Sequence, residues 1–563
     1  MKHLMPLLCV TSLVLAAEGA TRVWDNDGAD CRWSNPVNWS DDAAPVLNDT
    51  VQINAACSAG SPVVVDGAAT NNTVYLGQNA GSEGHLSLTA GGSMFCDDEL
   101  YIGYNGKGSL FQTGGSTIVS RRIQLGYGLG AEGNYVIDGG MYRPDAWQSH
   151  IGVSGTGIVS IINGEMWPTG EGGRHVFIGD NATGYGRVEI AKLGAFTITN
   201  VTSDLYVGYR GRGEIFVNGG TLDTRRSIFI GQTNFFDSAS KLVVNDGKLQ
   251  ADQAVQVGVY GRGELFVSTT NMSAGHIYTA QHPGSHGRAE FTNSFVQLFS
   301  SGCVVVGERG HGELLMRGTV INGNANAGKI AVRQNESASG VLRGSGTLST
   351  FSGGLVNNGL IVADGFGATA SLVVSGDSGH NPVFAATIEN TSTNGVYARN
   401  GGKLVTYPIR LAQAADPRDY TWGDAADDPE IDMVNSVRVT VPGNSNGSAF
   451  MHVSLQAPDR DDVPAMPKNA PVVGLWEIGF SGISSLASAD VEARYDHVAS
   501  GRNAPQMYQY DPVNEAWTKL VVEELQGHRA KVSGLPVFAS PAGRSLGLIA
   551  ALRQEAASLV IIK

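Results

Sequence analysis

The chain has 563 residues, of which 75 are glycine and only 16% are charged, and its net charge is −14. The glycines do not follow the collagen period, and the chain is too rich in apolar residues to be a disordered protein. The negative net charge argues against a nucleic-acid partner.

Residues 1–19 have the pattern of a signal peptide. Lys2 and His3 precede an apolar stretch over residues 4–17, and small residues follow it, so we expect cleavage after Gly19. No later stretch is apolar over the roughly 20 residues that a membrane-spanning helix needs. The sequence therefore predicts a protein that is secreted or held at the cell surface, without a membrane span.

Residues 20–73 precede a long repeat region and differ from it in composition. Trp24, Trp33 and Trp39 gather here. One interpretation is an N-terminal cap that covers the open end of the repeats with large aromatic side chains. The other is an exposed aromatic platform for a carbohydrate, and the cap is the simpler of the two.

The cysteines fall into two groups. Cys31 and Cys57 flank the cap segment and are candidates for a disulfide in an oxidising compartment. Cys96 and Cys303 lie in strand-like runs, where we expect buried small side chains. None of the cysteine and histidine spacings predicts a zinc site.

Residues 74–412 repeat one pattern, an apolar run that ends in glycine and is followed by a turn and two further runs. The spacing of the run-ending glycines is about 25 residues, which is typical of a solenoid. These glycines are Gly77, Gly103, Gly126, Gly152, Gly179, Gly208, Gly231, Gly258 and Gly307. One coil, around 278–280, lacks the glycine. Tight turns such as 105–108 and 210–213 alternate with longer ones such as 78–84, so the unit is a pair of coils of roughly 50 residues.

The runs predict β-strands rather than helices. They are short, rich in β-branched and aromatic residues, and bounded by Gly, Asn and Asp, as in Glu214–Val217 and Lys241–Val244. Glycine suits the corners because it adopts positive φ without steric cost. We therefore predict an all-β parallel solenoid, a β-helix, and the usual chirality of parallel crossovers favours the right-handed form.

The composition changes again after the repeats. Residues 413–432 are rich in aspartate and are interpreted as a solvated acidic linker, with Ca²⁺ binding at 424–432 as the alternative because hard cations take oxygen ligands. Longer alternating runs separated by turns predict an antiparallel β-sandwich over residues 433–550. Residues 551–563 are expected to form a C-terminal tail, and the stretch around 548–557 has a helix-like pattern.

Several short motifs resemble those of exported bacterial β-helix proteins that carry autotransporter-associated β-strand repeats. The motifs are Trp33-x5-Trp39-Ser40, Asn48-Asp49-Thr50-Val51, Leu342-Arg343-Gly344-Ser345-Gly346-Thr347-Leu348 and Val356-Asn357-Asn358-Gly359-Leu360-Ile361. The resemblance covers roughly residues 22–412 and implies a β-helix scaffold and an exported protein. It does not imply an activity. The C-terminal residues lack the pattern of a membrane β-barrel translocator, so self-translocation is not expected.

Three residue types recur at equivalent places in the coils. Stacking would align Arg212 and Arg262 with His311, and would align Glu214 and Glu264 with Glu313. Three tyrosines follow a run-ending glycine, namely Tyr104, Tyr127 and Tyr209. These columns are either a duplicated surface whose charges stabilise little, or a binding strip for a polymer in which tyrosine rings stack on sugars.

The signals for catalysis are weaker. Gly310-His311-Gly312 matches a motif of β-helix polygalacturonases, but the aligned turns carry Arg, Lys or Thr in place of the histidine. Asp97-Asp98 is the acidic pair within the coils, and it is interpreted as part of a solvated loop. A lyase would need an arginine or lysine base beside an acidic cluster that holds calcium. Arg121-Arg122 and Arg225-Arg226 have no acidic cluster in phase and are expected to be solvent-facing strand ends.

These observations predict a non-catalytic secreted or cell-surface β-helix protein that acts in adhesion, matrix structure or glycan binding. The alternative is a polysaccharide-degrading lyase or hydrolase on a pectin-lyase-like β-helix. A polysaccharide or surface glycan is the expected partner, and no cofactor or metal site is expected apart from the Ca²⁺ alternative. The sequence leaves the oligomeric state open.

Overall fold

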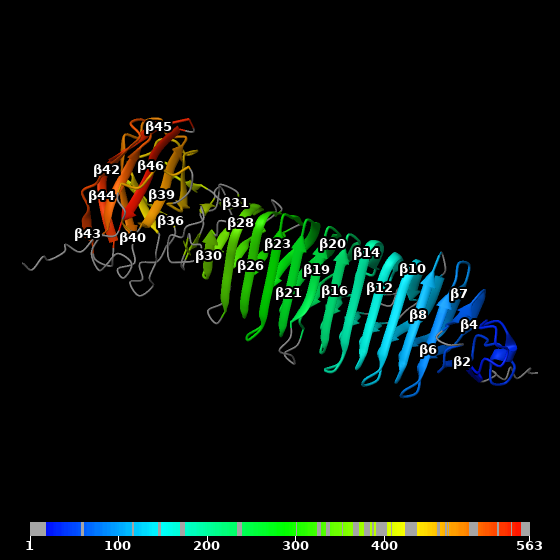
Figure 1. Cartoon of the computed structure of the whole chain (residues 1–563). Helices are drawn as coiled ribbons and strands as arrows, with labels where there is room; N and C mark the ends of the chain where they lie inside the picture. Colours follow the sequence, from blue (N-terminus) through cyan, green and yellow to red (C-terminus); the bar gives the residue numbers. More distant parts are fainter. Residues whose placement is uncertain are drawn as a thin grey trace, which may run out of the picture.

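The computed structural model describes residues 19–57, 61–114, 117–144, 148–168, 175–232, 239–299, 301–323, 328–333, 338–351, 353–363, 371–376, 383–384, 388–389, 402–406, 408–422, 436–458, 462–467, 470, 472–494, 505–525, 529–541 and 543–552. The predicted fold class is confirmed: about 13 turns of about 25 residues form a parallel β-solenoid, and antiparallel strands follow at the C-terminal end. Figure 1 shows the coils in a row, with the C-terminal strands grouped at one end. The handedness stays a prediction.

Each coil contributes strands to three parallel sheets, here called sheets 1, 2 and 3. Sheet 1 contains the short strands that end at the corner glycines. Its strands are β1 (Thr21–Val23), β2 (Thr50–Ile53), β5 (Thr73–Leu76), the second halves of β7 (Ser93–Ile102) and β9 (Thr117–Leu125), β11 (Ser149–Ile151), β13 (Val176–Ile178), β15 (Leu205–Val207), β18 (Ile228–Ile230), the second halves of β20 (Lys248–Val257) and β22 (Asn271–Thr279), β25 (Val304–Val306), β27 (Ile330–Val332), β29 (Leu355–Asn357) and β32 (Val383–Phe384).

Sheet 2 follows the turn after each corner. Its strands are β3 (Val63–Val65), β6 (Glu83–Leu88), β8 (Lys107–Thr113), the first parts of β10 (Glu132–Pro144), β12 (Thr156–Met166) and β14 (Tyr185–Ile198), β16 (Arg212–Asn218), β19 (Ser240–Asn245), β21 (Arg262–Ser268), β23 (His286–Thr292), the first parts of β26 (His311–Asn322) and β28 (Ser339–Phe351), β30 (Leu360–Ala363) and β33 (Ile388–Glu389).

Sheet 3 closes the coil. It contains β4 (Ala68–Asn71), β17 (Thr221–Thr224), β24 (Phe295–Leu298), β31 (Ser371–Gly376), β34 (Lys403–Thr406) and the remaining parts of the long strands.

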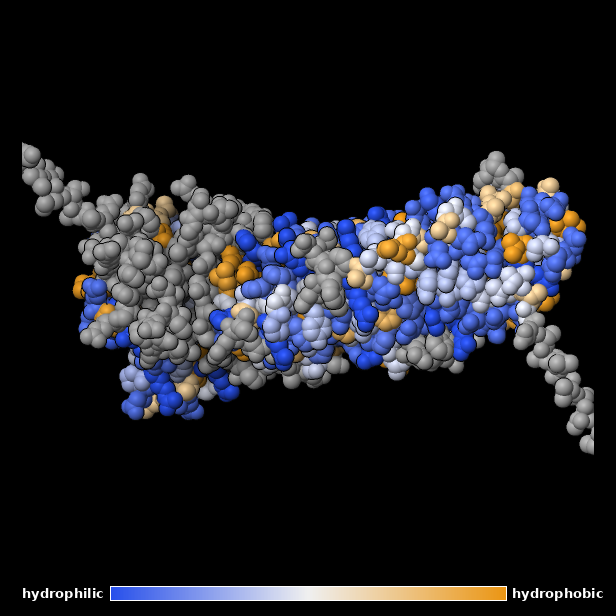
Figure 2. All heavy atoms as spheres, turned by 90° about the horizontal axis from the view of Figure 1, so that it is seen from below, coloured by the Kyte–Doolittle hydropathy of each residue, from blue (hydrophilic) through white to orange (hydrophobic). Residues whose placement is uncertain are grey.

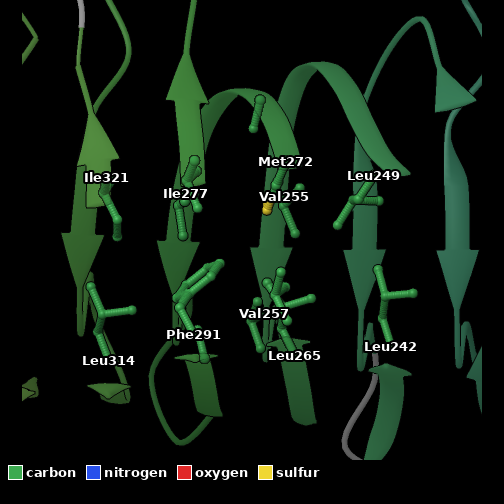
Figure 3. Packing of buried hydrophobic residues seen from close by; sticks show 14 of the residues in the cluster. Leu242, Leu249, Val255, Val257, Leu265, Met272, Ile277, Phe291, Leu314 and Ile321 are labelled. Carbon is green, nitrogen blue, oxygen red and sulfur yellow. The ribbon is translucent and has the colours of Figure 1, made fainter. Parts of the chain in front are cut away.

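The core is a set of apolar columns inside the coils. In sheet 2, each strand places a buried side chain directly above that of the preceding coil, and Figure 3 shows several of them. One such column is Val188, Ile215, Leu242, Leu265, Ala289 and Leu314. A single coil cannot bury this face alone, so the stability of each coil depends on its neighbours. On the outside, Figure 2 shows mainly hydrophilic side chains with hydrophobic ones scattered among them.

The corner glycines have the predicted role. All nine run-ending glycines have φ between 59° and 76°. A Cβ on Gly103 would lie 2.1 Å from the carbonyl oxygen of Glu132 in the next coil. In the coil without glycine, Ala280 takes the corner with φ 53°. Tight turns such as 104–106 alternate with longer ones such as 127–131, as predicted.

The predicted N-terminal cap, residues 20–73, is shorter than expected. β1 and β2 already belong to sheet 1, and β4 belongs to sheet 3, so a coil lies within these residues. The sequence concealed it because the corner after Ile53 has an asparagine in place of glycine. The cap proper is the segment around η1 (Pro36–Asn38).

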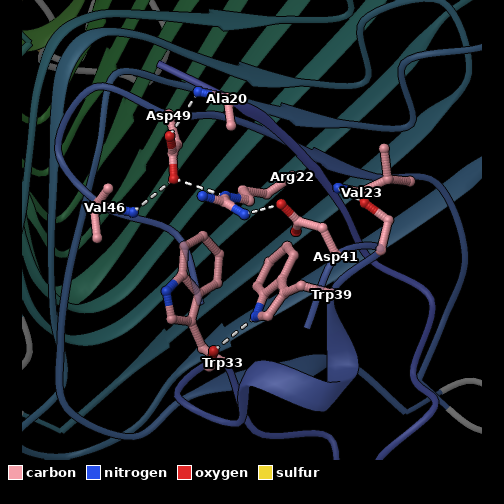
Figure 4. A network of polar contacts seen from close by, with 9 residues as sticks. Ala20, Arg22, Val23, Trp33, Trp39, Asp41, Val46 and Asp49 are labelled. Carbon is pink, nitrogen blue, oxygen red and sulfur yellow. Dashed lines mark hydrogen bonds and ion pairs between the residues drawn. The ribbon is translucent and has the colours of Figure 1, made fainter. Parts of the chain in front are cut away.

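The tryptophans of the cap are buried, which excludes the platform interpretation. Trp24 and Trp33 are 4% exposed, and Trp39 is 0% exposed. Their rings meet edge to face, with centroids 5.1 Å and 4.9 Å from that of Trp39. The indole N–H of Trp39 donates a hydrogen bond to the carbonyl of Trp33 at 2.9 Å (Figure 4). Cys31 and Cys57 form a disulfide in the same segment.

A buried carboxylate also holds this segment together. Asp49 accepts hydrogen bonds from the Nε of Arg22 and from the backbone N–H groups of Ala20 and Val46, and Arg22 also pairs with Asp41 (Figure 4). Burial alone would raise the pKa of Asp49, but these hydrogen bonds hold it below its usual value of 3.8.

We expect the cap to lose stability in acid through Asp49. Because the pKa of Asp49 is lower in the folded chain than in the unfolded chain, its contribution is present above pH 3.8 and is lost as the pH falls through the folded-state value. The midpoint of thermal unfolding, followed by tryptophan fluorescence between about pH 2 and pH 6, should therefore be lower for Asp49→Asn at the upper end and equal at the lower end. A difference that stays constant across the range would contradict this role.

The C-terminal strands form two antiparallel sheets, in agreement with the predicted sandwich. One sheet continues sheet 3 and contains β34, β35 (Ile409–Arg410), β38 (Phe450–Gln456), β39 (Val472–Ser481), β46 (Gly543–Leu552), β41 (Gln506–Asp511), β42 (Ala516–Lys519) and β45 (Phe538–Ser540). The other contains β36 (Arg418–Trp422), β37 (Val437–Val441), β40 (Ser488–Arg494), β44 (Arg529–Pro536) and β43 (Glu523–Leu525).

Two predicted boundaries at this end are wrong. Within the predicted linker, residues 413–432, strand β36 pairs with β37. Trp422 at the end of β36 is fully buried, and its indole N–H donates a hydrogen bond to the hydroxyl oxygen of Thr406 at 2.8 Å. Strand pairing and this burial outweigh the acidic composition. The Ca²⁺ candidate, residues 424–432, lies outside the described residues. β46 occupies 548–552 as a strand in place of the helix-like segment, and it extends into the predicted tail, residues 551–563.

Candidate functional site

The outer face of sheet 1 carries a column of aromatic and polar side chains. In a three-residue strand such as β15, Leu205 and Val207 point into the core, and Tyr206 between them is half-buried on the outside. Repeating this in register gives one outward residue per coil. We call the column the sheet 1 strip: Tyr75, Tyr101, Gln124, His150, Phe177, Tyr206, Phe229, Gln256 and Tyr278.

Most rings of the strip stack along the solenoid. The centroids of Tyr75 and Tyr101 are 4.8 Å apart, with 4° between the ring planes. A second stack joins Phe177 to Tyr206 at 5.3 Å and Tyr206 to Phe229 at 4.9 Å. Stacked neighbours cover one another's faces, so these rings present mainly their edges to a ligand.

The predicted tyrosines lie beside the strip and turn across it. Tyr104 stands at 85° to Tyr101, and Tyr127 stands at 82° to it. Tyr104 and Tyr127 stack on each other at 4.8 Å. Tyr209 belongs to a separate group, at 61° to Phe177. Sequence reasoning found these three but missed the strip, although its signal was present as the middle residue of each short run.

Ion pairs border the strip where sheet 3 meets sheet 1. Arg121 lies 3.7 Å from Asp98, and Arg122 lies 3.0 Å from Glu99 of the preceding coil. Each of these two arginines therefore has an acidic partner on the preceding coil. The Asp97-Asp98 pair belongs to strand β7 at a bulge, rather than to a loop.

The second arginine pair has acidic partners as well. Arg226 lies 3.3 Å from Asp204, and Arg225 lies 3.4 Å from Asp252. Nδ1 of His175 lies 3.5 Å from the Asp204 carboxylate, and its ring meets that of Tyr206 at 5.3 Å. The acidic partners lie on neighbouring coils, where linear spacing does not reveal them.

Two of these carboxylates are partly desolvated. Burial raises the pKa of Asp204, and the charges of Arg226 and His175 only partly oppose this. Burial likewise raises the pKa of Glu99, against the charge of Arg122. Carboxylates beside half-buried aromatic rings can accept hydrogen bonds from the hydroxyl groups of a ligand.

The outer face of sheet 2 has a column whose charge alternates from coil to coil. Its members are Arg187, Glu214, Lys241, Glu264, Arg288 and Glu313. The expected alignment of Glu214, Glu264 and Glu313 at every second coil is therefore present, and a cation lies between each pair. Lys241 lies 3.2 Å from Glu264, and Arg288 lies 3.6 Å from Glu313.

Glu214 is buried and well partnered. It accepts a hydrogen bond from the hydroxyl of Tyr185 at 2.7 Å and pairs with Arg212 of its own strand. Burial alone would raise the pKa of Glu214, but these two partners hold it below its usual value. The charges of Arg212 and Glu214 thus neutralise each other, and this part of the sheet 2 column stabilises the repeat.

Arg262 and His311 lie in one column, two coils apart, as the repeat spacing suggested. His286 lies between them, so that three basic side chains follow one another on consecutive strands. Among the described residues, no group of three or more His, Cys, Asp or Glu is placed to hold a metal ion. In the same part of the chain, no helix is long and apolar enough to cross a membrane.

Comparisons with protein-family models, curated proteins and solved structures give no match for this chain.

Proposed function

We propose that this protein is a non-catalytic, exported scaffold that binds an extended polysaccharide along the sheet 1 strip, in adhesion or in an extracellular matrix. The proposal rests mainly on the tyrosines beside the strip, whose ring planes are steeply inclined to the rings of the strip. A sugar ring needs an exposed aromatic face, and the rings stacked within the strip cover one another. Tyr104 and Tyr127 stack on each other too, so each has at most one face left for a sugar. Tyr104, Tyr127 and Tyr209 are half-buried and stand at steep angles to the stacks beside them.

The borders of the strip support the same ligand. Asp98, Glu99 and Asp204 with their arginine partners supply hydrogen-bond donors and acceptors along the length of the strip. An aromatic floor with a few placed polar groups is the usual composition of a small-molecule site, here repeated from coil to coil.

The disulfide supports export. Cys31 and Cys57 are joined within the cap, and stable disulfides belong to oxidising compartments. The signal-peptide pattern at residues 1–19 points the same way. The resemblance to exported β-helix proteins stays a prediction.

A polysaccharide-degrading enzyme is the second candidate, and one observation favours it. His175, Arg226 and the desolvated carboxylate of Asp204 gather beside Tyr206 on the strip. A carboxylate whose pKa is raised by burial can act as a general acid. The binding experiment must therefore also measure products.

The test measures co-sedimentation of the full chain with insoluble polysaccharides and affinity electrophoresis with soluble ones, while scoring new reducing or unsaturated ends. The double variant Tyr127→Ala with Tyr209→Ala should bind about thirtyfold more weakly, because each ring contributes about 1 kcal/mol. Phe295→Ala is the matched control, since this ring is 44% exposed on sheet 3, away from the strip.

Each result has a definite meaning. Binding without products, weakened only in the double variant, supports the proposal. Product release that Asp204→Asn abolishes would establish the enzyme instead. Failure to bind any polysaccharide would overturn the glycan proposal.

A further inference from the structure

A pocket lies at one edge of sheet 2, beside the turns that lead into β21, β23, β26 and β28. Arg262, His286, His311 and Ser339 occupy the same position on these four consecutive strands. They line a pocket of about 480 Å³ together with Glu264, Arg288 and Glu313. The residues that line this pocket differ from those of the sheet 1 strip.

The two histidines face each other across adjacent coils. Their ring centroids are 4.9 Å apart, with 26° between the planes. Nδ1 of His311 is hydrogen-bonded to the hydroxyl of Ser339 at 2.6 Å. Both imidazoles are therefore held at the pocket, next to the guanidinium of Arg262 on the neighbouring strand.

The charge pattern of this column differs from that of the rest of sheet 2. Near the N-terminal end, the equivalent column reads Glu83, Lys107 and Glu132, with Lys107 3.5 Å from Glu132. At the pocket, three basic side chains occur in succession. Like charges this close repel one another once the imidazoles are protonated.

The acidic groups at the pocket are already matched by cations. Glu264 pairs with Lys241 at 3.2 Å, and Glu313 pairs with Arg288 at 3.6 Å. Glu290 in the next column lies 2.9 Å from Arg288 and 3.4 Å from Arg317.

The turns above the pocket add polar and basic groups. Tyr260 and His282 stack at 3.7 Å, and Arg309 lies in the next turn. Burial and Arg309 lower the pKa of His282. The pocket and its surroundings therefore combine several basic groups with carboxylates that already have partners.

We propose that Arg262, His286 and His311 bind an oxyanion, the sulfate or carboxylate substituent of an acidic glycan. That the oxyanion belongs to a glycan rests on the proposed glycan-binding function. That the pocket binds an oxyanion does not rest on it. An anion would form charge-assisted hydrogen bonds with the guanidinium and the two protonated imidazoles, and it would relieve the repulsion between the imidazoles.

The binding depends on pH. Partial burial, with the nearby His311 and Arg262, lowers the pKa of His286. A bound anion favours the charged imidazole and raises that pKa again. Binding therefore takes up protons, and the affinity for the anion increases as the pH falls below about 6.5.

The experiment titrates the full chain with inorganic sulfate at about pH 5.5 and pH 7.5, following the imidazole resonances by NMR and the affinity by calorimetry. We expect roughly tenfold tighter binding at the lower pH, and loss of both the binding and its pH dependence in His286→Gln with His311→Gln. His452→Gln, a histidine on β38 of the C-terminal sheet, is the matched control and should bind sulfate as the unmodified chain does.

Further experiments test separately whether the pocket binds an oxyanion and whether that oxyanion belongs to a glycan. Dextran sulfate and polygalacturonate should bind in competition with inorganic sulfate, and neutral dextran should not compete. Tyr127→Ala with Tyr209→Ala should leave sulfate binding unchanged, so failure of the strip and failure of the pocket are distinguishable. Absence of sulfate binding, or binding that the two histidine substitutions leave intact, would overturn the pocket. If sulfate binds but neither acidic glycan competes with it, the proposal that the oxyanion belongs to an acidic glycan would be overturned.

Discussion

Replacing Gly103 by alanine is expected to lower the free energy of unfolding of its coil by about 3 kcal/mol, since a left-handed backbone costs about 1–2 kcal/mol and a forced contact adds a similar amount. Gly103 has φ 73°, and its new Cβ would lie 2.1 Å from a backbone oxygen and 2.5 Å from a backbone carbon of Glu132. The coils must therefore separate locally. Hydrogen exchange followed by mass spectrometry should be faster in peptides over residues 100–135 and unchanged over residues 240–290.

Two substitutions separate the causes of this loss. Gly81 has φ 78°, but a Cβ there would meet nothing within 4 Å, so Gly81→Ala should cost only about 1 kcal/mol. Ala280→Gly should stabilise its coil by a similar amount, because the alanine already has φ 53°. Equal effects of Gly103→Ala and Gly81→Ala would show that the contact between coils does not contribute.

Trp39→Ala is expected to destabilise the N-terminal end of the solenoid by about 3–5 kcal/mol, as for other buried tryptophans. The side chain is fully buried, it contacts Trp24 and Trp33, and its N–H bonds to the Trp33 carbonyl. Because coils are stabilised by their neighbours, the loss should be concentrated in residues 20–75. Hydrogen exchange in that region reports it directly.

The control is a tryptophan of the other end. Trp517 is only half-buried and its ring lies 5.3 Å from that of Tyr510 at 56°, so Trp517→Ala should cost less and should leave residues 20–75 unaffected. Unchanged exchange over residues 20–75 in Trp39→Ala would show that the tryptophan cluster does not hold the cap.

The sequence revealed the solenoid because one physical constraint repeats at every corner. Glycine is needed where φ is positive and where the next coil passes within 2.1 Å of a would-be Cβ, as at Gly103. The coil that starts at β2 escaped notice because that corner carries Asn54. The β36 strand was missed because the burial of Trp422 depends on a partner strand that local composition does not show.

The candidate site was only partly predictable. Tyr104, Tyr127 and Tyr209 were found because they follow corner glycines. Asp204 and Arg226 were not connected, because coils differ in length and bulges shift the register, as between Ala251 and Ala254. Which acid faces which arginine is therefore set by the stacking of the coils. The pocket at His286 was missed for the same reason, since its three basic residues belong to three different coils.

Strand β34 has a mechanical consequence. It pairs in parallel with β31 of the solenoid and in antiparallel with β38 of the C-terminal sheet, so one strand belongs to both parts. The strands run across the long axis in Figure 1, and tension along that axis is therefore carried by the hydrogen bonds between coils. Through the hydrogen bonds of β34, the C-terminal sheet bears the same tension as the coils. Under tension the solenoid would lengthen by whole coils, and each coil that unfolds would release about 80 Å of chain.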